Sequence, residues 1–364
     1  MSTEESRGMT ARECTLKMLL AVYKDKQFSH TVKGKYLDKL EDKRERALAT
    51  RMFEGCIERG IELDYIINCF SKTPVRKMKP VIAAILRMTV YQLRFMDKIP
   101  DGAACNEAVK LAKKYGFTGL SGFVNGVARS VARAEMIPYP KKEKSLTEYL
   151  SVTYSIPTML VEQITRQYGA ETAERIFEAF LSEDNPLSIR CMSHSIDVEE
   201  LAAQLRKEGI IVEPGAYSED ALLLYGIDAP ERLPGFSEGA FYIQDESSMQ
   251  AVLAAGLAGD ETVLDLCAAP GGKTVMAADI LMSRGDGMVC SRDISDSKVA
   301  LIRENVQRCG LTNVTVSCKD ATCFYKEDEE RYDVVWADVP CSGLGIIGKK
   351  PDIKLFMTEE QQKE

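Results

Sequence analysis

The chain has 364 residues, of which 45% are hydrophobic and 28% are charged, a composition typical of a globular protein with two or three domains. Charged residues interrupt the apolar runs and the N-terminus is polar, so we expect neither a transmembrane helix nor a signal peptide. Eleven cysteines without regular spacing are typical of a reducing compartment, and no Cys/His cluster has metal-ligand spacing. The sequence therefore predicts a cytoplasmic protein with no membrane association and no metal.

The net charge of -8 hides an uneven distribution along the chain. Residues 1–144 hold 28 Lys and Arg against 17 Asp and Glu, whereas the remainder holds 19 basic and 38 acidic residues. A basic N-terminal part favours contact with nucleic acid, although lysines that only solvate helices would explain the same charge equally well.

Residues 1–135 are expected to form an all-α bundle, because apolar residues recur there at helical spacing. Thr10 and Glu13 have the spacing of a capping box, which predicts the start of the first helix. Pro80 can open a later helix at its first turn. Residues 136–147 are rich in proline and lysine and are predicted to be a linker.

Residues 148–240 mix short helical and strand patterns and predict a small α+β domain. Residues 241–364 alternate apolar strands with helices, which predicts a parallel sheet of the α/β class with right-handed crossovers. The expected strands are Thr262–Leu266, Gly287–Ser291, Asn313–Cys318 and Asp333–Ala337, and the expected helices are Lys273–Ser283 and Asp296–Cys309.

A glycine turn joins the first of these strands to its helix. Gly271 and Gly272 let the backbone approach a ligand closely, and the helix N-terminus offers free N–H groups. Asp293, Asp320 and Asp338 follow the next three strands, whose carboxyl ends lie at one edge of a parallel sheet. Each of these features alone is more simply explained as part of a turn. Because the glycine turn and the three aspartates lie at the carboxyl ends of four consecutive strands, together they favour a ligand site. The turn lacks GxGxxG spacing, which disfavours a hydride-carrying dinucleotide.

Cys341 is the candidate reactive thiol. It follows Pro340 in a glycine-containing loop after the fourth strand, where a thiolate can attack an electrophilic partner. A cysteine is more often a small buried hydrophobe, and that is the interpretation we give to most of the others.

Together these residues resemble the Sun/Fmu family of ribosomal RNA cytosine-C5 methyltransferases, which use S-adenosylmethionine. The matching segments are Leu266–Lys273, Asp338–Gly343, Gln244–Ser248 and Lys350–Lys354. The N-terminal part looks like NusB, an RNA-binding bundle, through Ile85–Leu93, Asn106–Val109 and Phe123–Gly126. The resemblance implies a multidomain fold, with an all-α NusB-like bundle, a small α+β domain and a Rossmann-like methyltransferase domain.

By this resemblance, S-adenosylmethionine is the cofactor and small-subunit ribosomal RNA is the partner. The residues implied to hold the methionine end of the cofactor are Cys267, Ala268, Ala269, Pro270, Gly271, Gly272 and Lys273. Asp293 would hold the ribose and Asp320 the adenine amine, and Asp338 would lie beside the methyl group and the target base. Cys341 would assist release of the product. The family's attacking cysteine lies in a Thr-Cys motif on a later strand.

No Thr-Cys pair follows Cys341 in this sequence. We therefore expect a methyltransferase domain that is truncated after its fourth strand. We also expect the protein to be a monomer. A second departure is Arg190-Cys191-Met192, where the family usually has Arg-Val-Asn. Two alternatives stay open. In the first alternative, the chain is an RNA-binding protein with a catalytically incomplete methyltransferase domain. In the second, Cys341 itself attacks the base.

Overall fold

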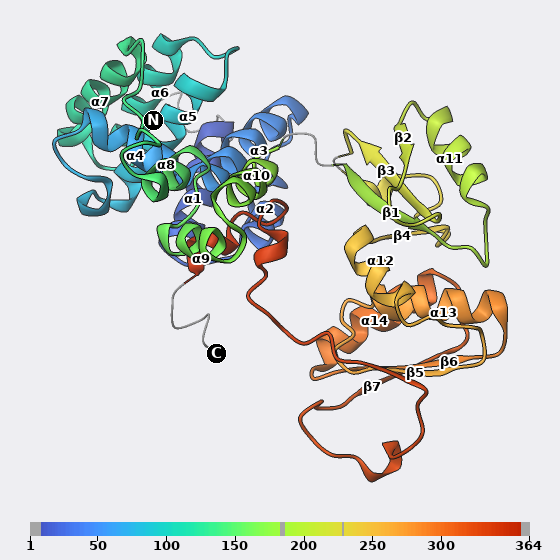
Figure 1. Ribbon diagram of the computed structural model, residues 1–364. Coiled ribbons are helices and arrows are strands. Elements are labelled where there is room, and N and C mark those ends of the chain that lie inside the picture. Colours follow the sequence, from blue (N-terminus) through green and yellow to red (C-terminus); the bar gives the residue numbers. More distant parts are fainter. Residues whose placement is uncertain (1–8, 183–185, 228, 358–364) are drawn as a thin grey trace. The chain divides into compact units, whose positions relative to one another are not determined.

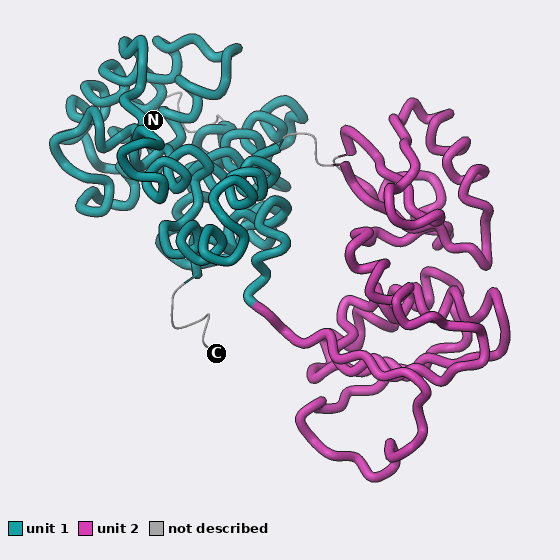
Figure 2. The backbone as a smooth tube through the Cα atoms, viewed as in Figure 1, with its two compact units in different colours: residues 1–182, 342–364 teal, residues 183–341 magenta. Residues whose placement is uncertain are grey.

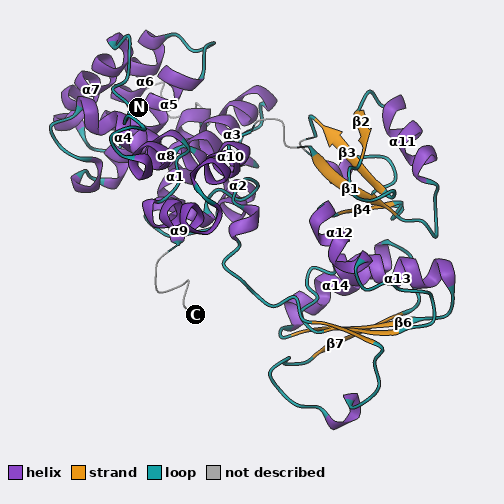
Figure 3. Cartoon of the chain, in the orientation of Figure 1, coloured by secondary structure: helices purple, strands orange, loops and turns teal. Residues whose placement is uncertain are grey.

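The computed structural model describes residues 9–182, 186–227 and 229–357, and the chain forms two compact units (Figures 1 and 2). The first unit combines residues up to 182 with those from 342 onward, and the second unit runs from 183 to 341. The first is helical, and the second contains both four-stranded sheets found among the described residues (Figure 3). No helix in these described ranges combines the length and apolarity that crossing a bilayer requires.

The helical unit begins with a bundle of seven helices in its described residues. They are α1 (Ala11–Tyr23), α2 (Ser29–Leu37), α3 (Lys43–Glu58), α4 (Gly60–Phe70), α5 (Pro80–Phe95), α6 (Asp101–Lys114) and α7 (Ser121–Arg133). Thr10 caps α1 as predicted, since its side chain accepts a hydrogen bond from the N–H of Glu13. The Glu13 carboxylate instead accepts hydrogen bonds from Lys114 and Tyr115, which ties α1 to the end of α6.

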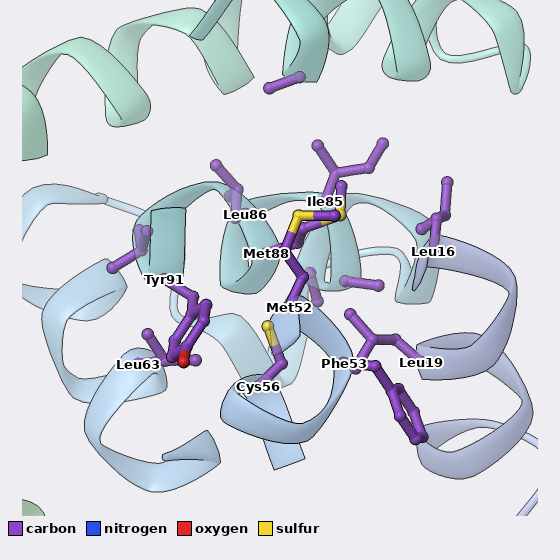
Figure 4. Packing of buried hydrophobic residues seen from close by; sticks show 14 of the residues in the cluster. Leu16, Leu19, Met52, Phe53, Cys56, Leu63, Ile85, Leu86, Met88 and Tyr91 are labelled. Carbon is purple, nitrogen blue, oxygen red and sulfur yellow. The ribbon is translucent and has the colours of Figure 1, made fainter. Parts of the chain in front are cut away.

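Helix α5 lies at the centre of this bundle, and Pro80 opens it at the first turn as predicted. Its buried residues lie on nearly every side of the helix, which requires neighbours all round. Figure 4 shows Ile85, Leu86 and Met88 of α5 packed among side chains from its neighbours. The residues that meet them there are Leu16 and Leu19 of α1, Met52, Phe53 and Cys56 of α3, and Leu63 of α4.

Three further helices also belong to the helical unit: α8 (Leu146–Thr153), α9 (Thr158–Tyr168) and α10 (Ala170–Phe180). The expected domain boundaries grouped them with the small sheet that follows. They separate from it because their apolar faces form a core of their own around Leu160 and Phe177. Ser155, fully buried between α8 and α9, accepts a hydrogen bond from the N–H of Ile61 and so joins them to α4.

The second unit begins with an antiparallel sheet in the strand order β2-β3-β1-β4. Its strands are β1 (Leu187–Cys191), β2 (Ile211–Pro214), β3 (Ala221–Tyr225) and β4 (Phe241–Ile243), and α11 (Val198–Lys207) packs on them. The sequence pattern predicted β1 and β2 but not β3 or β4. Strand β4 completes this sheet although the expected boundary placed it in the catalytic domain.

The second sheet of this unit is parallel, as the strand–helix alternation predicts, and its strand order is β7-β6-β5-β8. Its strands are β5 (Thr262–Asp265), β6 (Met288–Asp293), β7 (Val314–Cys318) and β8 (Val334–Trp336). Helices α12 (Glu246–Leu253), α13 (Gly272–Arg284) and α14 (Asp296–Arg308) lie over one face of it (Figure 1). Since β5 lies between β6 and β8, the carboxyl ends of three strands meet around its terminal residue.

A buried charge network fixes the small sheet to the parallel-sheet part. Arg190 of β1 and Asp279 of α13 are both fully buried and form an ion pair. Asp279 also accepts hydrogen bonds from the backbone N–H groups of Ser193 and His194. Burial would raise the pKa of Asp279, but the positive charge of Arg190 and these hydrogen bonds lower it below its ordinary value. Arg190 therefore stabilises the packing of the small sheet on α13 within this unit.

Candidate active site

The glycine turn after β5 is held from three sides. The N–H of Ala268 donates to the carbonyl of Arg292 in β6, and the N–H of Ala269 donates to the Asp293 carboxylate at 3.0 Å. The carbonyl of Pro270 accepts a hydrogen bond from Asn305 of α14 at 3.0 Å. Gly271 has φ +110°, a conformation that a residue with a side chain adopts only with strain. This backbone is fixed before any ligand binds.

Asp293 ends β6 and is nearly buried, with 4% of its surface exposed. Its carboxylate accepts hydrogen bonds from the N–H groups of Ala269 and Ile294, and Lys298 lies 3.2 Å from it. Burial would raise the pKa of Asp293, but these hydrogen bonds and the lysine lower it. The structure places the Asp293 carboxylate at the carboxyl end of β6, where the sequence predicted it.

Asp320 follows β7 and lies in a loop that Arg292 anchors from inside the sheet. The Arg292 guanidinium pairs with Asp328 and donates to the hydroxyl of Tyr332. It also lies 5.7 Å from the ring centroid of Tyr325, whose hydroxyl accepts a hydrogen bond from the N–H of Asp320. A hydrogen bond from the N–H of Thr322 lowers the pKa of Asp320. The loop therefore presents a second ionised carboxylate.

Lys273 and Asp338 are brought together across the sheet edge. The Lys273 ammonium, in the first turn of α13, lies 2.6 Å from the Asp338 carboxylate, in the loop after β8. Asp338 remains 59% exposed, whereas Lys273 is 20% exposed. The sequence assigned Lys273 to the cofactor turn and did not anticipate this pair. The pair holds the Asp338–Cys341 loop against the start of the helix.

The candidate thiols differ in exposure. Cys341 is exposed at the end of the Asp338 loop, where a reacting partner can reach it. Cys267, in the glycine turn, is partly covered, and its pKa is raised by burial and by the negative charge of Asp293 and Asp265. A thiol whose pKa is raised is a poor nucleophile, so Cys267 suits a lining role.

Asp265 is a residue that the sequence analysis did not single out. It ends β5 with 1% of its surface exposed, and one carboxylate oxygen accepts a hydrogen bond from the Thr274 hydroxyl at 2.8 Å. The other oxygen, Oδ1, is buried and has no hydrogen-bond partner among the described residues. Burial raises the pKa of Asp265 to about 6. The signal in the sequence was an aspartate that closes an otherwise apolar strand.

An orphaned acceptor beside a glycine turn fits a ligand that carries hydrogen-bond donors. S-adenosylmethionine has such donors in its ammonium, its ribose hydroxyls and its adenine amine. Asp265 and Asp293 end β5 and β6, and Asp320 follows the neighbouring β7, so their carboxylates can accept from donors of this kind. The residues present therefore fit the cofactor that the sequence resemblance implies.

Family models match three consecutive parts of the chain. The NusB family model matches residues 9–133, and a ferredoxin-like domain model of RsmF/B-like methyltransferases matches residues 156–227. A model described as 16S rRNA methyltransferase RsmB/F matches residues 252–364. A NusB-like helical domain, a ferredoxin-like domain and a parallel-sheet methyltransferase domain define the class of protein, and they confirm the predicted fold class.

Curated relatives identify the family within this class. A probable ribosomal RNA small subunit methyltransferase B of Bacillus subtilis is 37% identical over 349 residues, covering 95% of this chain and 76% of the relative. A probable enzyme of the same name from Synechocystis is 31% identical, covering 86% of this chain and 70% of the relative. The chain belongs to the ribosomal RNA small subunit methyltransferase B family, the family that the sequence motifs resembled.

Solved structures show the same fold. The crystal structure of PH0851 has a TM-score of 0.76 at 22% identity, covering 98% of this chain and 81% of that one. The structure of NSun6 from Pyrococcus horikoshii with SFG has a TM-score of 0.50 at 19% identity, covering 57% of this chain and 76% of that one. At these identities the likeness concerns the fold alone.

Proposed function

We propose that the chain acts in the methylation of carbon 5 of a cytosine in small-subunit (16S) ribosomal RNA, with S-adenosylmethionine as the methyl donor. The observation that carries this proposal is the Lys273–Asp338 ion pair, because it joins the glycine turn to the loop of an exposed thiol, Cys341. A cofactor turn and a reactive loop are thereby fixed to each other at one edge of one sheet.

The cofactor would lie at the carboxyl ends of β5, β6 and β7. The backbone from Cys267 to Lys273 would wrap its methionine end, while Asp293 and Asp320 would accept hydrogen bonds from the ribose hydroxyls and the adenine amine. The orphaned oxygen of Asp265 supplies one more buried acceptor. When bound, S-adenosylmethionine supplies an electrophilic methyl group.

The base needs activation because carbon 5 of cytosine is a weak nucleophile. A cysteine thiolate would add to carbon 6, which would place electron density on carbon 5. Carbon 5 would then take the methyl group as the bond from that group to the cofactor's sulfonium sulfur breaks and leaves a neutral thioether. Removal of the carbon 5 proton and elimination of the thiolate restore the carbon 5–carbon 6 double bond. We assign Cys341 to this release step, with Asp338 beside the target base. The attacking cysteine of the family belongs to a Thr-Cys motif on a later strand, and no Thr-Cys pair follows Cys341 in this sequence.

The helical unit is the proposed RNA platform. Residues 65–96 contain six residues that are Lys or Arg and no Asp or Glu. The cations in the connection between α4 and α5, which we call the α4–α5 corner, are exposed. Those exposed cations are Lys72, Arg76, Lys77 and Lys79. Clustered positive charge of this kind binds the phosphate backbone without reading its sequence.

A trapping assay tests the chemistry and separates the alternatives. The chain is incubated with S-adenosylmethionine and 16S RNA that contains 5-fluorocytosine, whose carbon 5 cannot lose a proton, so that a covalent adduct accumulates. Wild type, Cys341→Ala and the control Cys323→Ala, which removes another exposed thiol, are compared by denaturing electrophoresis. If Cys341 serves only in release, wild type and both variants bind S-adenosylmethionine and RNA alike and none of them forms an adduct, because no Thr-Cys pair follows Cys341 in this sequence.

Each remaining outcome has a distinct meaning. An adduct that Cys341→Ala abolishes and Cys323→Ala retains would identify Cys341 as the attacking thiol and overturn its assignment to release. Binding of RNA without binding of S-adenosylmethionine, and without an adduct, would favour the RNA-binding alternative for the 364-residue chain. No binding of S-adenosylmethionine would overturn the proposed function itself.

A further inference from the structure

Residues 344–357, which we call the strap, belong to the methyltransferase part by sequence and to the helical unit by packing. The RsmB/F family model extends through them to residue 364. In the structure they lie in the helical unit, as the red segment beside α2 and α9 in Figure 1 and the second teal segment in Figure 2. Only two residues of the chain lie between Cys341 and Leu344.

Two buried charges of the strap match the ends of two helices. Asp352 is 3% exposed, and its carboxylate accepts a hydrogen bond at 2.8 Å from the N–H of Ser29, the first residue of α2. Lys354 is 5% exposed, and its ammonium donates to the carbonyl of Glu58, the last residue of α3. A carboxylate thus meets a helix N-terminus and an ammonium meets a helix C-terminus, which is the favourable arrangement at both ends.

Apolar side chains flank these charges on both sides. Leu344, Ile347 and Ile353 pack into the core of α8–α10, with Ile347 fully covered at 1% exposure. Phe356 packs edge-on against Phe28 with ring centroids 5.7 Å apart. The other residues of the strap that join an apolar core are Leu355, which contacts that of the bundle, and Met357, which contacts that of α8–α10. The strap therefore bridges both parts of the helical unit.

Burial of two charged side chains shows that this contact is specific. Removing an ammonium or a carboxylate from water is costly unless a partner of matching polarity receives it. Burial lowers the pKa of Lys354 to about 8, yet its ammonium has the Glu58 carbonyl as acceptor. Apolar contact alone would not account for the burial of Asp352 and Lys354, whose charges are bound by the ends of α2 and α3.

We propose that the strap couples the helical unit to the Cys341 loop through the chain that joins them, with Asp352 and Lys354 as positioning residues that fix the strap to the helical unit. The coupling rests on the proposed function, whereas the docking of the strap does not. RNA bound to the helical unit then changes the environment of Cys341 through the strap.

Hydrogen–deuterium exchange of the whole chain tests the docking. We expect protected amides in residues 344–357, and exchange there faster by about tenfold or more in Lys354→Met and Asp352→Ala. Asp352→Asn keeps an oxygen that can accept from Ser29, and Lys350→Met removes an exposed charge of the same segment, so both should stay near wild type. Free exchange of the strap in wild type, or unchanged protection in Lys354→Met, would overturn the docking.

The coupling is tested by alkylation of Cys341, read by peptide mass spectrometry with and without a 16S rRNA transcript. We expect RNA to change the Cys341 alkylation rate by about fivefold or more in wild type and in Lys350→Met. Lys354→Met should lose this response while its RNA affinity stays unchanged. A response that persists after the strap has detached would overturn the coupling. A docked strap in a chain that binds no RNA would overturn the coupling and the proposed RNA function together, whereas RNA binding with a freely exchanging strap would overturn the docking and the coupling and leave the proposed RNA function intact.

Discussion

Asp265 shows how one buried carboxyl links stability to ligand binding. The Thr274 hydroxyl donates a hydrogen bond to one of its oxygens, whereas Oδ1 is buried without a hydrogen-bond partner among the described residues. Such a group is destabilising when ionised in the free protein and becomes useful when a ligand brings the missing donor. If Asp265 contacts the cofactor as proposed, its cost in stability is offset by ligand binding, a trade-off that is common where function and stability compete.

The pH dependence of stability should report this cost. Burial raises the pKa of Asp265 from 3.8 to about 6, so the folded chain binds more protons than the unfolded chain between these values. The contribution of Asp265 to the free energy of unfolding therefore falls as the pH rises from about 4 to 6, by up to roughly 3 kcal/mol. Urea denaturation of wild type and Asp265→Asn across this range isolates the contribution as their difference.

The exposed Asp286, before the amino end of β6, supplies the control. Asp286→Asn should follow the wild-type pH profile. Added S-adenosylmethionine should reduce the change with pH in the free energy of unfolding of wild type, because its hydrogen-bond donors stabilise the ionised Asp265 carboxylate. Identical pH profiles for wild type and Asp265→Asn would contradict the assignment of a raised pKa to this group.

Two glycines within helices show how tertiary contact overrides helix propensity. Gly126, in the interior of α7, has open space where a Cβ would project. A Cβ on Gly55 of α3 would lie 1.9 Å from the ring of Tyr91, so α3 and α5 approach as closely as they do only because this position lacks a side chain. The same substitution should therefore have opposite effects in the two helices.

We expect Gly126→Ala to raise the free energy of unfolding by about 0.5–1 kcal/mol, because alanine loses less backbone entropy on folding. Gly55→Ala should lower it by about 1–3 kcal/mol, since Tyr91 must move within a packed core. Chemical denaturation measures both. Stabilisation by Gly55→Ala would show that α3 and α5 can separate at no cost.

Prediction from sequence succeeded where the signal was local. Pro80 at the start of α5 and the glycine turn before α13 each fix a conformation by themselves, and the parallel direction of β5–β8 follows from the alternation of strands and helices. It failed where only a tertiary partner decides. Strand β4 has three residues and exists because β1 pairs with it. The Lys350–Lys354 motif was visible, but nothing local indicates that Asp352 and Lys354 meet helix ends far away in the sequence.

At the scale of the whole molecule, charge divides the chain into a basic part and an acidic part. The excess of Lys and Arg lies in residues 1–144, and the excess of Asp and Glu lies in the remainder. RNA should therefore meet the helical unit first, through contacts that release counterions from its phosphates. Their number can be read from the dependence of affinity on salt.

Paired substitutions can locate these contacts. Arg76→Gln/Lys77→Gln removes two exposed cations from the α4–α5 corner, and Lys207→Gln/Arg232→Gln removes the same two residue types from exposed positions of the second unit. For binding of a 16S rRNA fragment, the first variant should reduce the slope of log affinity against log salt by about 1 to 2, since each phosphate contact contributes roughly 0.7–0.9. The second should leave the slope unchanged, because its cations lie in the acidic part of the chain.

Equal slopes for wild type and the first variant would mean that the corner of α4 and α5 does not contact RNA. A reduced slope in the second variant alone would place the platform on the other unit, and the basic charge of the bundle would then serve only to solvate its helices.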